Sequence, residues 1–284
     1  MYAVGRRCRT AEKASCFAAV PANAVPYEKV IRRHRKIAFA IIGGMLYNIV
    51  SDIKKGETAV SDRITQLLID SFWKILLPGL TATIPLTIIS FSLALVIATV
   101  TALVQFAQIP VLTPIARFYI WITRGTPLLV QLFVIFFGLP RVGVVLDPFP
   151  AAIIVFAFNT GAYDAETIRA ALESVPQSQL EAGECVGMTY RQTIRRIVLP
   201  QAMRTAFPSL SNSLISLVKD TSLAANITVS EMFMTTQRIV ARTYEPLLLY
   251  LEVGLIYLLF STVLSRLQNR GEKRLNSYRK RGVN

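Results

Sequence analysis

Few side chains in this sequence have the types and spacing that metal binding or nucleophilic catalysis requires. The one histidine, His34, lies in a basic run, and the three cysteines, Cys8, Cys16 and Cys185, show neither metal-site spacing nor an obvious pairing partner. The inventory therefore excludes a zinc site and a histidine-based triad. Because no G-x-x-x-x-G-K-S/T phosphate loop occurs, any ATP that drives this protein must bind to another chain.

Within the apolar part of the chain, Asp164 and Glu166 form the close acidic pair that a membrane-embedded enzyme, for instance one acting on lipids, would need. They lack a histidine or metal partner, whereas such a site requires an identifiable acid, base or metal group. An enzyme of this kind is kept as an alternative, and a channel that works without partner subunits is another.

The composition is that of an integral membrane protein. Of the 284 residues, 53% are hydrophobic and 17% are charged, and the mean hydropathy is +0.47, which soluble domains rarely reach. The net charge is +14, but the basic residues lie at the chain ends and in short loops rather than in one stripe interleaved with aromatic residues. This distribution follows the positive-inside rule and argues against nucleic-acid binding.

Apolar stretches of helical length predict an all-α protein with five spans, because a span needs roughly 20 residues. The expected spans cover residues 80–104, 115–139, 151–173, 190–218 and 246–266. Pro85 should kink or tighten the first of them. In the second, Pro127 fits a first helical position with Thr126 as its cap, so a short helix should end near Arg124.

The chain divides into three parts. Residues 1–60 are an atypical basic extension, residues 61–275 a transmembrane domain, and residues 276–284 a basic cytoplasmic tail. The apolar stretch 37–50 is short, so it forms either an interfacial helix or a sixth span. Residues 61–77 carry their apolar side chains on one helical face, which predicts an amphipathic surface helix.

The basic residues of the C-terminal end should be cytoplasmic. With five spans, residues 181–200 are then cytoplasmic and residues 219–245 lie outside. At the outer end of the fourth span, Lys219 and Asp220 form either a local ion pair or an outer gate.

The third and fourth spans carry polar side chains at membrane depth, where such groups face a bundle interior or a water-filled path. Each of them has the alternative role of joining helices by hydrogen bonds. The candidates for a substrate pathway are Asn159, Thr160, Tyr163, Ser209, Asn212, Ser213 and Ser216.

The segment "EAGECVGMTYRQTIRRIVLP" (181–200) is the most polar ordered stretch between the spans. Ser178 and Glu181 have the S-x-x-E spacing of a capping box, and Thr189 begins a second one. Gly187 suits the position after a helix end. The pattern predicts a helix too short to cross a membrane, then a sharp turn and a new helix, which suits docking in a partner's groove.

The same segment resembles the coupling-loop motif of permease subunits of bacterial binding-protein-dependent ABC importers. The residues that carry the motif are Glu181, Ala182, Gly183, Gly187, Ile197, Leu199 and Pro200, with Gly183 in place of the second alanine of the usual triplet. "RGTPLLVQLF" (124–133) and "SLVKDTSLAANI" (216–227) resemble the polar amino-acid branch of that family. The longer stretch "SLVKDTSLAANITVSEMF" (216–233) and "ARTYEP" (241–246) are most similar to its cystine-permease members.

This resemblance implies the type I ABC importer permease fold, in the bacterial cell membrane, with a cytoplasmic coupling helix that contacts an ATPase subunit. It implies a second permease copy, identical or not, a dimer of ATP-binding subunits that holds ATP and Mg, and an extracytoplasmic solute-binding protein. This chain would bind no cofactor, and hydrolysis would reside in the partner. The favoured substrate is L-cystine, with glutamine, arginine or histidine as alternatives. Glu181 either caps its helix or contacts the ATPase.

Overall fold

The computed structural model describes Gly44 and residues 58–281, and it divides the chain into two units, Met1–Thr65 and Gln66–Asn284. The predicted segment 37–50, apart from Gly44, and most of the basic extension lie outside the described residues. Every regular element of secondary structure in the described residues is a helix, and turns or short loops connect the helices that are not continuous.

The first predicted span is part of a longer continuous helix. Helix α2 (Thr58–Pro78), the π turn η1 (Gly79–Thr83) and α3 (Ile84–Phe106) follow one another without a break. The amphipathic segment 61–77 is therefore not a separate surface helix. Pro85 is preceded by a wider turn rather than a tighter one, because a π turn accommodates the ring and the missing N–H of proline.

The second predicted span is broken. Helix α4 (Leu112–Gly125) ends one residue after Arg124, as expected, and α5 (Leu128–Phe133) continues through η2 (Val134–Gly138) and η3 (Leu139–Val142) at an angle of 105°. Pro127 is the N-cap of α5 rather than its first helical residue, since its ψ of 139° is extended. Thr126 therefore does not cap this helix.

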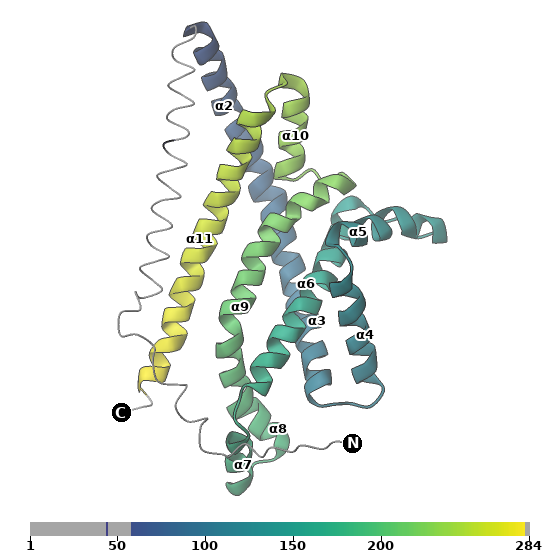
Figure 1. Cartoon of the computed structure of the whole chain (residues 1–284), viewed down its shortest axis with the longest axis vertical. Helices are drawn as coiled ribbons and strands as arrows, with labels where there is room; N and C mark the ends of the chain where they lie inside the picture. The colour runs from purple at the N-terminus through teal and green to yellow at the C-terminus, as the bar shows by residue number, and fades with distance from the viewer. Residues whose placement is uncertain (1–43, 45–57, 282–284) are drawn as a thin grey trace, which may run out of the picture. The chain divides into compact units, whose positions relative to one another are not determined.

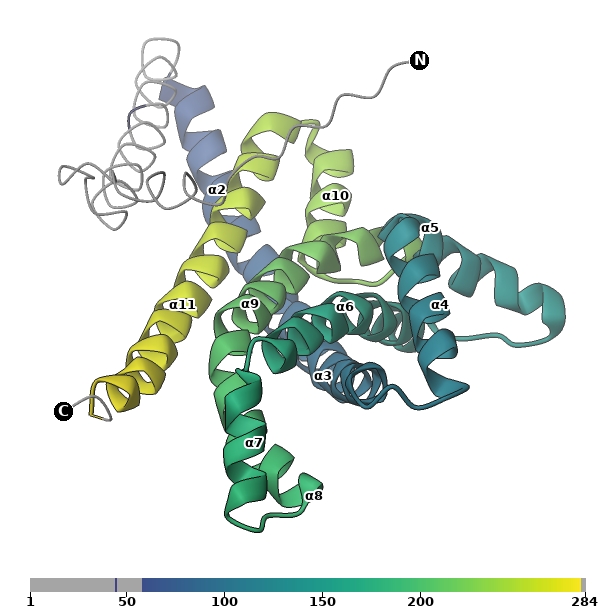
Figure 2. The same cartoon turned by 60° about the horizontal axis from the view of Figure 1, so that its bottom comes forward.

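The third and fourth spans enclose a short hairpin. Helix α6 (Pro148–Glu173) leads into α7 (Gln177–Cys185) and α8 (Tyr190–Thr193), which continues through the π turn η4 (Ile194–Val198) into α9 (Leu199–Asp220). Figure 1 shows α7 and α8 together at the lower end of α6 and α9, and Figure 2 shows them from below. The hairpin is thus held by the two helices that carry most of the polar candidates.

The chain then turns back at the other end. The 3-10 segment η5 (Thr221–Ile227) precedes α10 (Met232–Thr243), and α11 (Pro246–Arg281) runs back toward the α7 end (Figure 1). Helix α6 packs against α3 along its length and against α9 on another side. Small residues allow the close approach, among them Ala98, Ala102, Ala162, Ala165, Ala202 and Ala206, all of them buried.

Among the described residues, Asp62–Phe106 and Pro246–Leu275 are long and apolar enough to cross a membrane, and the bent pair Leu112–Gly125 and Leu128–Val142 qualifies as one broken span. Helices α6 and α9 have 26 and 22 residues and are also long enough to span, but polar side chains lower their hydropathy. Helix α6 is largely buried among the other helices, which fits that composition, whereas α9 buries only one side.

Candidate functional site

The hairpin of residues 177–193 begins differently from the prediction. Pro176, with ψ of 139°, is the N-cap of α7 and makes no side-chain capping bond. The helix therefore starts at Gln177, before Ser178 could cap it, and the predicted Ser178–Glu181 capping box is wrong. Glu181 lies exposed in the second turn, so the capping role proposed for it is excluded.

The turn of the hairpin agrees with the sequence. Gly187 has φ of +75°, a left-handed conformation that favours glycine. Its N–H donates to the Glu184 carbonyl at 2.9 Å, and the Met188 N–H donates to the Gly183 carbonyl at 3.0 Å. These two bonds are those of a Schellman motif, which satisfies the last carbonyls of α7.

The second helix has the predicted cap. The Gln192 N–H donates to the Thr189 hydroxyl at 3.4 Å, and the Thr189 N–H donates to the Gln192 side-chain oxygen at 2.9 Å. This reciprocal pair confirms the T-x-x-Q capping box. A Schellman stop and a capping box thus fix both sides of the turn.

Most of the motif residues on the hairpin face outward. Glu181, Ala182 and Gly187 are exposed, as is Pro200 at the start of α9, whereas Gly183 is buried within the hairpin. Two further motif residues, Ile197 and Leu199, are half-buried, and Leu199 packs against the α3–α6–α9 core. The motif therefore combines an outward surface on α7 with residues that anchor the hairpin to the bundle.

A polar cavity of about 640 Å³ lies beside α4, α6 and α9, and is called the polar pocket below. Its lining residues are Arg124, Tyr163, Glu166, Thr167, Arg169, Ala170, Ala171, Thr205, Ala206, Ser209 and Ser213. Three of the predicted pathway residues, Tyr163, Ser209 and Ser213, are among them. Cavities of this volume accommodate small-molecule ligands.

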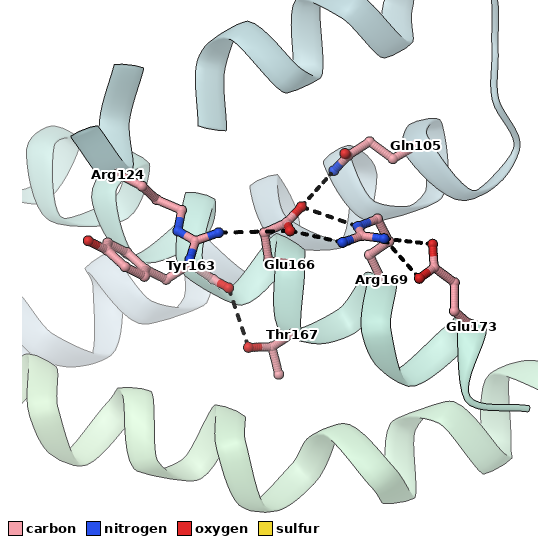
Figure 3. Close-up of polar contacts among 7 residues, drawn as sticks. All are labelled: Gln105, Arg124, Tyr163, Glu166, Thr167, Arg169 and Glu173. Carbon is pink, nitrogen blue, oxygen red and sulfur yellow. Dashed lines mark hydrogen bonds and ion pairs between the residues drawn. The ribbon is translucent and has the colours of Figure 1, made fainter. Parts of the chain in front are cut away.

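One wall of the polar pocket is an ionic network around Glu166 (Figure 3). Arg169 donates to the two Glu166 carboxylate oxygens at 3.2 and 3.0 Å and reaches Glu173 at 2.7 Å. Gln105, at the end of α3, donates to Glu166 at 3.5 Å. Arg124 of α4 approaches the same carboxylate at 3.8 Å, so Glu166 contacts groups from three helices.

Sequence reasoning missed Arg124, Glu166 and Arg169 as members of one site. A signal was present, because ionisable residues inside a span indicate a functional position. Glu166, Arg169 and Glu173 also have the spacing of one helix face. The sequence gives no sign that Arg124, which lies on α4, approaches Glu166 on α6.

Besides the polar pocket, the bundle has a row of exposed polar side chains along α9, called the α9 polar stripe below. Thr205, Ser209, Asn212, Ser216 and Lys219 are all exposed and recur at helical spacing along one side of the helix. Lipid would not solvate these hydroxyl, amide and ammonium groups. The stripe must therefore face water or another protein.

Other pathway candidates join helices. Asn159 is buried, and its amide donates to the Gln131 side-chain oxygen at 3.1 Å. The Gln131 amide in turn lies 2.7 Å from the Thr123 carbonyl and 2.8 Å from the Thr126 hydroxyl, across the bend between α4 and α5. Thr160, the next residue on α6, is half-buried.

Ser213 both lines the polar pocket and links two helices, because its hydroxyl donates to the buried Asp164 carboxyl of α6. The other Asp164 oxygen has no hydrogen-bond partner among the described residues. One carboxyl oxygen of Asp164 therefore accepts a hydrogen bond from α9, and the other is buried without a hydrogen-bond partner among the described residues.

At the end of α9 away from the hairpin, Lys219 is exposed and Asp220 is half-buried. Burial raises the pKa of the Asp220 carboxyl, and the charge of Lys219 opposes that change. In the part of the chain that is described, no ion pair within 4 Å joins them. Nearby, burial raises the pKa of Glu231, which caps α10 by accepting the Met234 N–H at 2.7 Å.

A second cavity, of about 520 Å³, lies among α4, α5 and α6 and has mainly apolar walls, for example Ile122, Val130 and Phe158. No group of three or more metal-ligating side chains occurs in the described residues. Of the two cavities, the polar pocket has the side chains that recognise a charged small molecule.

Comparisons with known proteins agree with this architecture. Residues 94–277 match the family described as "Binding-protein-dependent transport system inner membrane component". The chain is 47% identical over 213 residues to the L-cystine transport system permease protein TcyB of Bacillus subtilis, covering 75% of this chain and 91% of that protein. It is 39% identical to the probable amino-acid ABC transporter permease protein PatM of Vibrio harveyi, covering 71% and 92%.

Among solved structures, an amino acid ABC transporter crystallised with histidines matches with a TM-score of 0.67 and 30% identity, over 77% of this chain and 98% of that one. The family match over residues 94–277 includes the hairpin, the lining residues of the polar pocket and the α9 polar stripe. This chain therefore belongs to the family of inner-membrane components of binding-protein-dependent transport systems, and its fold is that of an ABC importer permease.

Proposed function

We propose that this chain is the permease subunit of an ATP-driven importer of L-cystine. The observation that carries the proposal is the α9 polar stripe, which lies beside a polar pocket in a protein whose other long helices expose many large apolar side chains. A second permease copy would cover the stripe and complete a pathway. Cystine is chosen over glutamine, arginine or histidine because the chain is 47% identical to an L-cystine permease.

The α7–α8 hairpin is the proposed coupling element. Its Schellman stop and capping box make it stiff on both sides of the turn, and its exposed residues Glu181 and Ala182 are available to a partner. An ATPase subunit would receive α7 in a surface groove. Closure of two ATPase subunits on ATP and Mg would move the paired hairpins and, through α6 and α9, open the pathway toward the binding protein.

Uptake of labelled cystine tests this proposal in bacteria that lack their own cystine systems. The cells receive this permease with its ATPase and its binding protein, and each unlabelled amino acid is added in excess. We expect saturable uptake that only cystine suppresses. Suppression by glutamine, arginine or histidine at lower concentration than by cystine would overturn the choice of substrate.

A further inference from the structure

We propose that Arg124 binds a carboxylate group of the transported amino acid inside the polar pocket. The inference rests on the proposed function and adds to it the group that recognises the substrate. It concerns the last turn of α4, where the guanidinium of Arg124 lies in the pocket wall beside Tyr163 and Glu166 (Figure 3).

Of the two arginines in the network, Arg124 makes the weaker contacts. Its contact with Glu166 is 3.8 Å, too long for a hydrogen bond, while Arg169 contacts the same carboxylate at 3.0 Å. No hydrogen bond from the Arg124 guanidinium is found among the described residues, and the Arg124 side chain is 43% exposed. Its N–H donors are therefore available to a ligand.

The charges of the network balance, but its hydrogen bonds are shared unequally between the two arginines. Arg124 and Arg169 contribute two positive charges, and Glu166 contributes one negative charge. Glu173 adds a second negative charge, which pairs with Arg169 at 2.7 and 2.8 Å, so the network as a whole is neutral. Arg124 is its cation without a hydrogen bond in the described part of the chain. A substrate carboxylate would give the Arg124 guanidinium the hydrogen-bonded partner that its long ion pair with Glu166 does not supply.

The geometry of Arg124 also suits this role. Its guanidinium carbon lies 5.2 Å from the centre of the Tyr163 ring, which holds the planar group in one orientation. A guanidinium fixed in this way presents paired N–H donors that match a carboxylate. Across the pocket, the hydroxyls of Thr205 and Ser209 on α9 offer neutral hydrogen-bond partners for the rest of the ligand.

A purely structural role is the competing explanation, in which Arg124 only ties α4 to α6 through Glu166. That role predicts a loss of stability on substitution, but no dependence on the chemical groups of the ligand. Three disulfide compounds separate the two roles. Cystine has both carboxylates and ammonium groups, 3,3′-dithiodipropionate has the carboxylates alone, and cystamine has the ammonium groups alone.

The test measures equilibrium binding of labelled cystine to the purified permease–ATPase complex in nanodiscs, without the binding protein, whose own selectivity would otherwise dominate. With the natural chain we expect dithiodipropionate to displace cystine and cystamine to fail at the same concentration. In Arg124→Gln we expect cystine affinity to fall about tenfold or more, as for a lost charge-assisted hydrogen bond. Arg117→Gln, an exposed arginine on the same helix, is the matched control and should bind as the natural chain does.

Equal displacement by cystamine and dithiodipropionate in the natural complex would overturn the proposal, and this comparison needs no variant that could misfold. Unchanged cystine affinity in a well-assembled Arg124→Gln complex would overturn it as well. If the natural complex transports cystine but binds none without the binding protein, the assignment to Arg124 fails while the proposed function stands. If it transports no cystine at all, the proposed function itself fails.

Discussion

Gly183 of α7 lies so close to Thr193 of α8 that a Cβ atom at position 183 would be 2.7 Å from both the Cγ2 and the Oγ1 atoms of Thr193. Real Cβ atoms do not approach other heavy atoms this closely. Thr193 has little freedom to move away, because it is buried and β-branched, and its hydroxyl bonds to the Thr189 carbonyl. The glycine that replaces alanine in the coupling motif is therefore matched to the threonine ten positions later.

Gly183→Ala should separate α7 from α8 and destabilise the hairpin by about 1–3 kcal/mol, as overpacked sites do. Because the hairpin is the proposed contact with the ATPase, less ATPase should co-purify with the permease. Thr193→Ala in the same chain should restore the contact by removing both clashing atoms. If Gly183→Ala retained full ATPase association without the second substitution, the packing explanation would be wrong.

The two predicted capping boxes give a matched pair of substitutions. Thr189→Ala removes the real cap of α8 and should lower stability by about 1 kcal/mol. Ser178→Ala should leave stability unchanged, because Pro176 begins α7 and Ser178 caps nothing. Thermal unfolding of the two purified variants checks this, and an equal loss in both would restore the rejected capping box.

The α9 polar stripe predicts a pattern of water access. In a chain whose three cysteines are replaced by serine, cysteines placed at Ser209, Asn212 and Ser216 should react with a membrane-impermeant thiol reagent in open membrane vesicles. A cysteine at Leu259, an exposed apolar position on α11, should not react, since lipid covers it. Equal protection of all four positions in a transport-active protein would contradict a water-filled pathway along α9.

Gln131 should matter more to stability than its place in an apolar segment implies. Gln131→Leu leaves the Thr123 carbonyl and the Asn159 amide without their partners, and each buried group of this kind costs about 1–3 kcal/mol. Asn159→Ala removes one of these contacts and should cost less. Thermal unfolding of the purified complex ranks the two variants, and the reverse order would show that the bend is not held by Gln131.

The sequence predicted well those features that depend on neighbouring residues. Thr189 and Gln192 are three residues apart and need no other part of the chain, and Gly187 needs only the end of its own helix. The Ser178 box failed for an equally local reason, since Pro176 set the start of the helix two residues earlier. The apolar stretches likewise predicted most helices, although they did not show that α2 and α3 are continuous.

Contacts between distant segments were beyond this kind of reasoning. Asn159 was placed in the pathway, but Gln131 reaches it from 28 positions away and makes it a link between helices. The sequence indicates only a helix end at Arg124, because its partners Tyr163 and Glu166 lie on another helix. Polar residues inside a span indicate that a function exists there, but their individual roles depend on which helices meet.

The proposed function is transport of cystine across a membrane with energy from ATP that a partner subunit hydrolyses. The most direct measurement is the accumulation of labelled cystine inside proteoliposomes that contain the assembled permease and ATPase, with the binding protein on the outside and ATP with Mg inside. We predict accumulation above the external concentration, which stops when ATP or the binding protein is omitted. Failure of the assembled, ATP-hydrolysing complex to concentrate cystine would contradict the account.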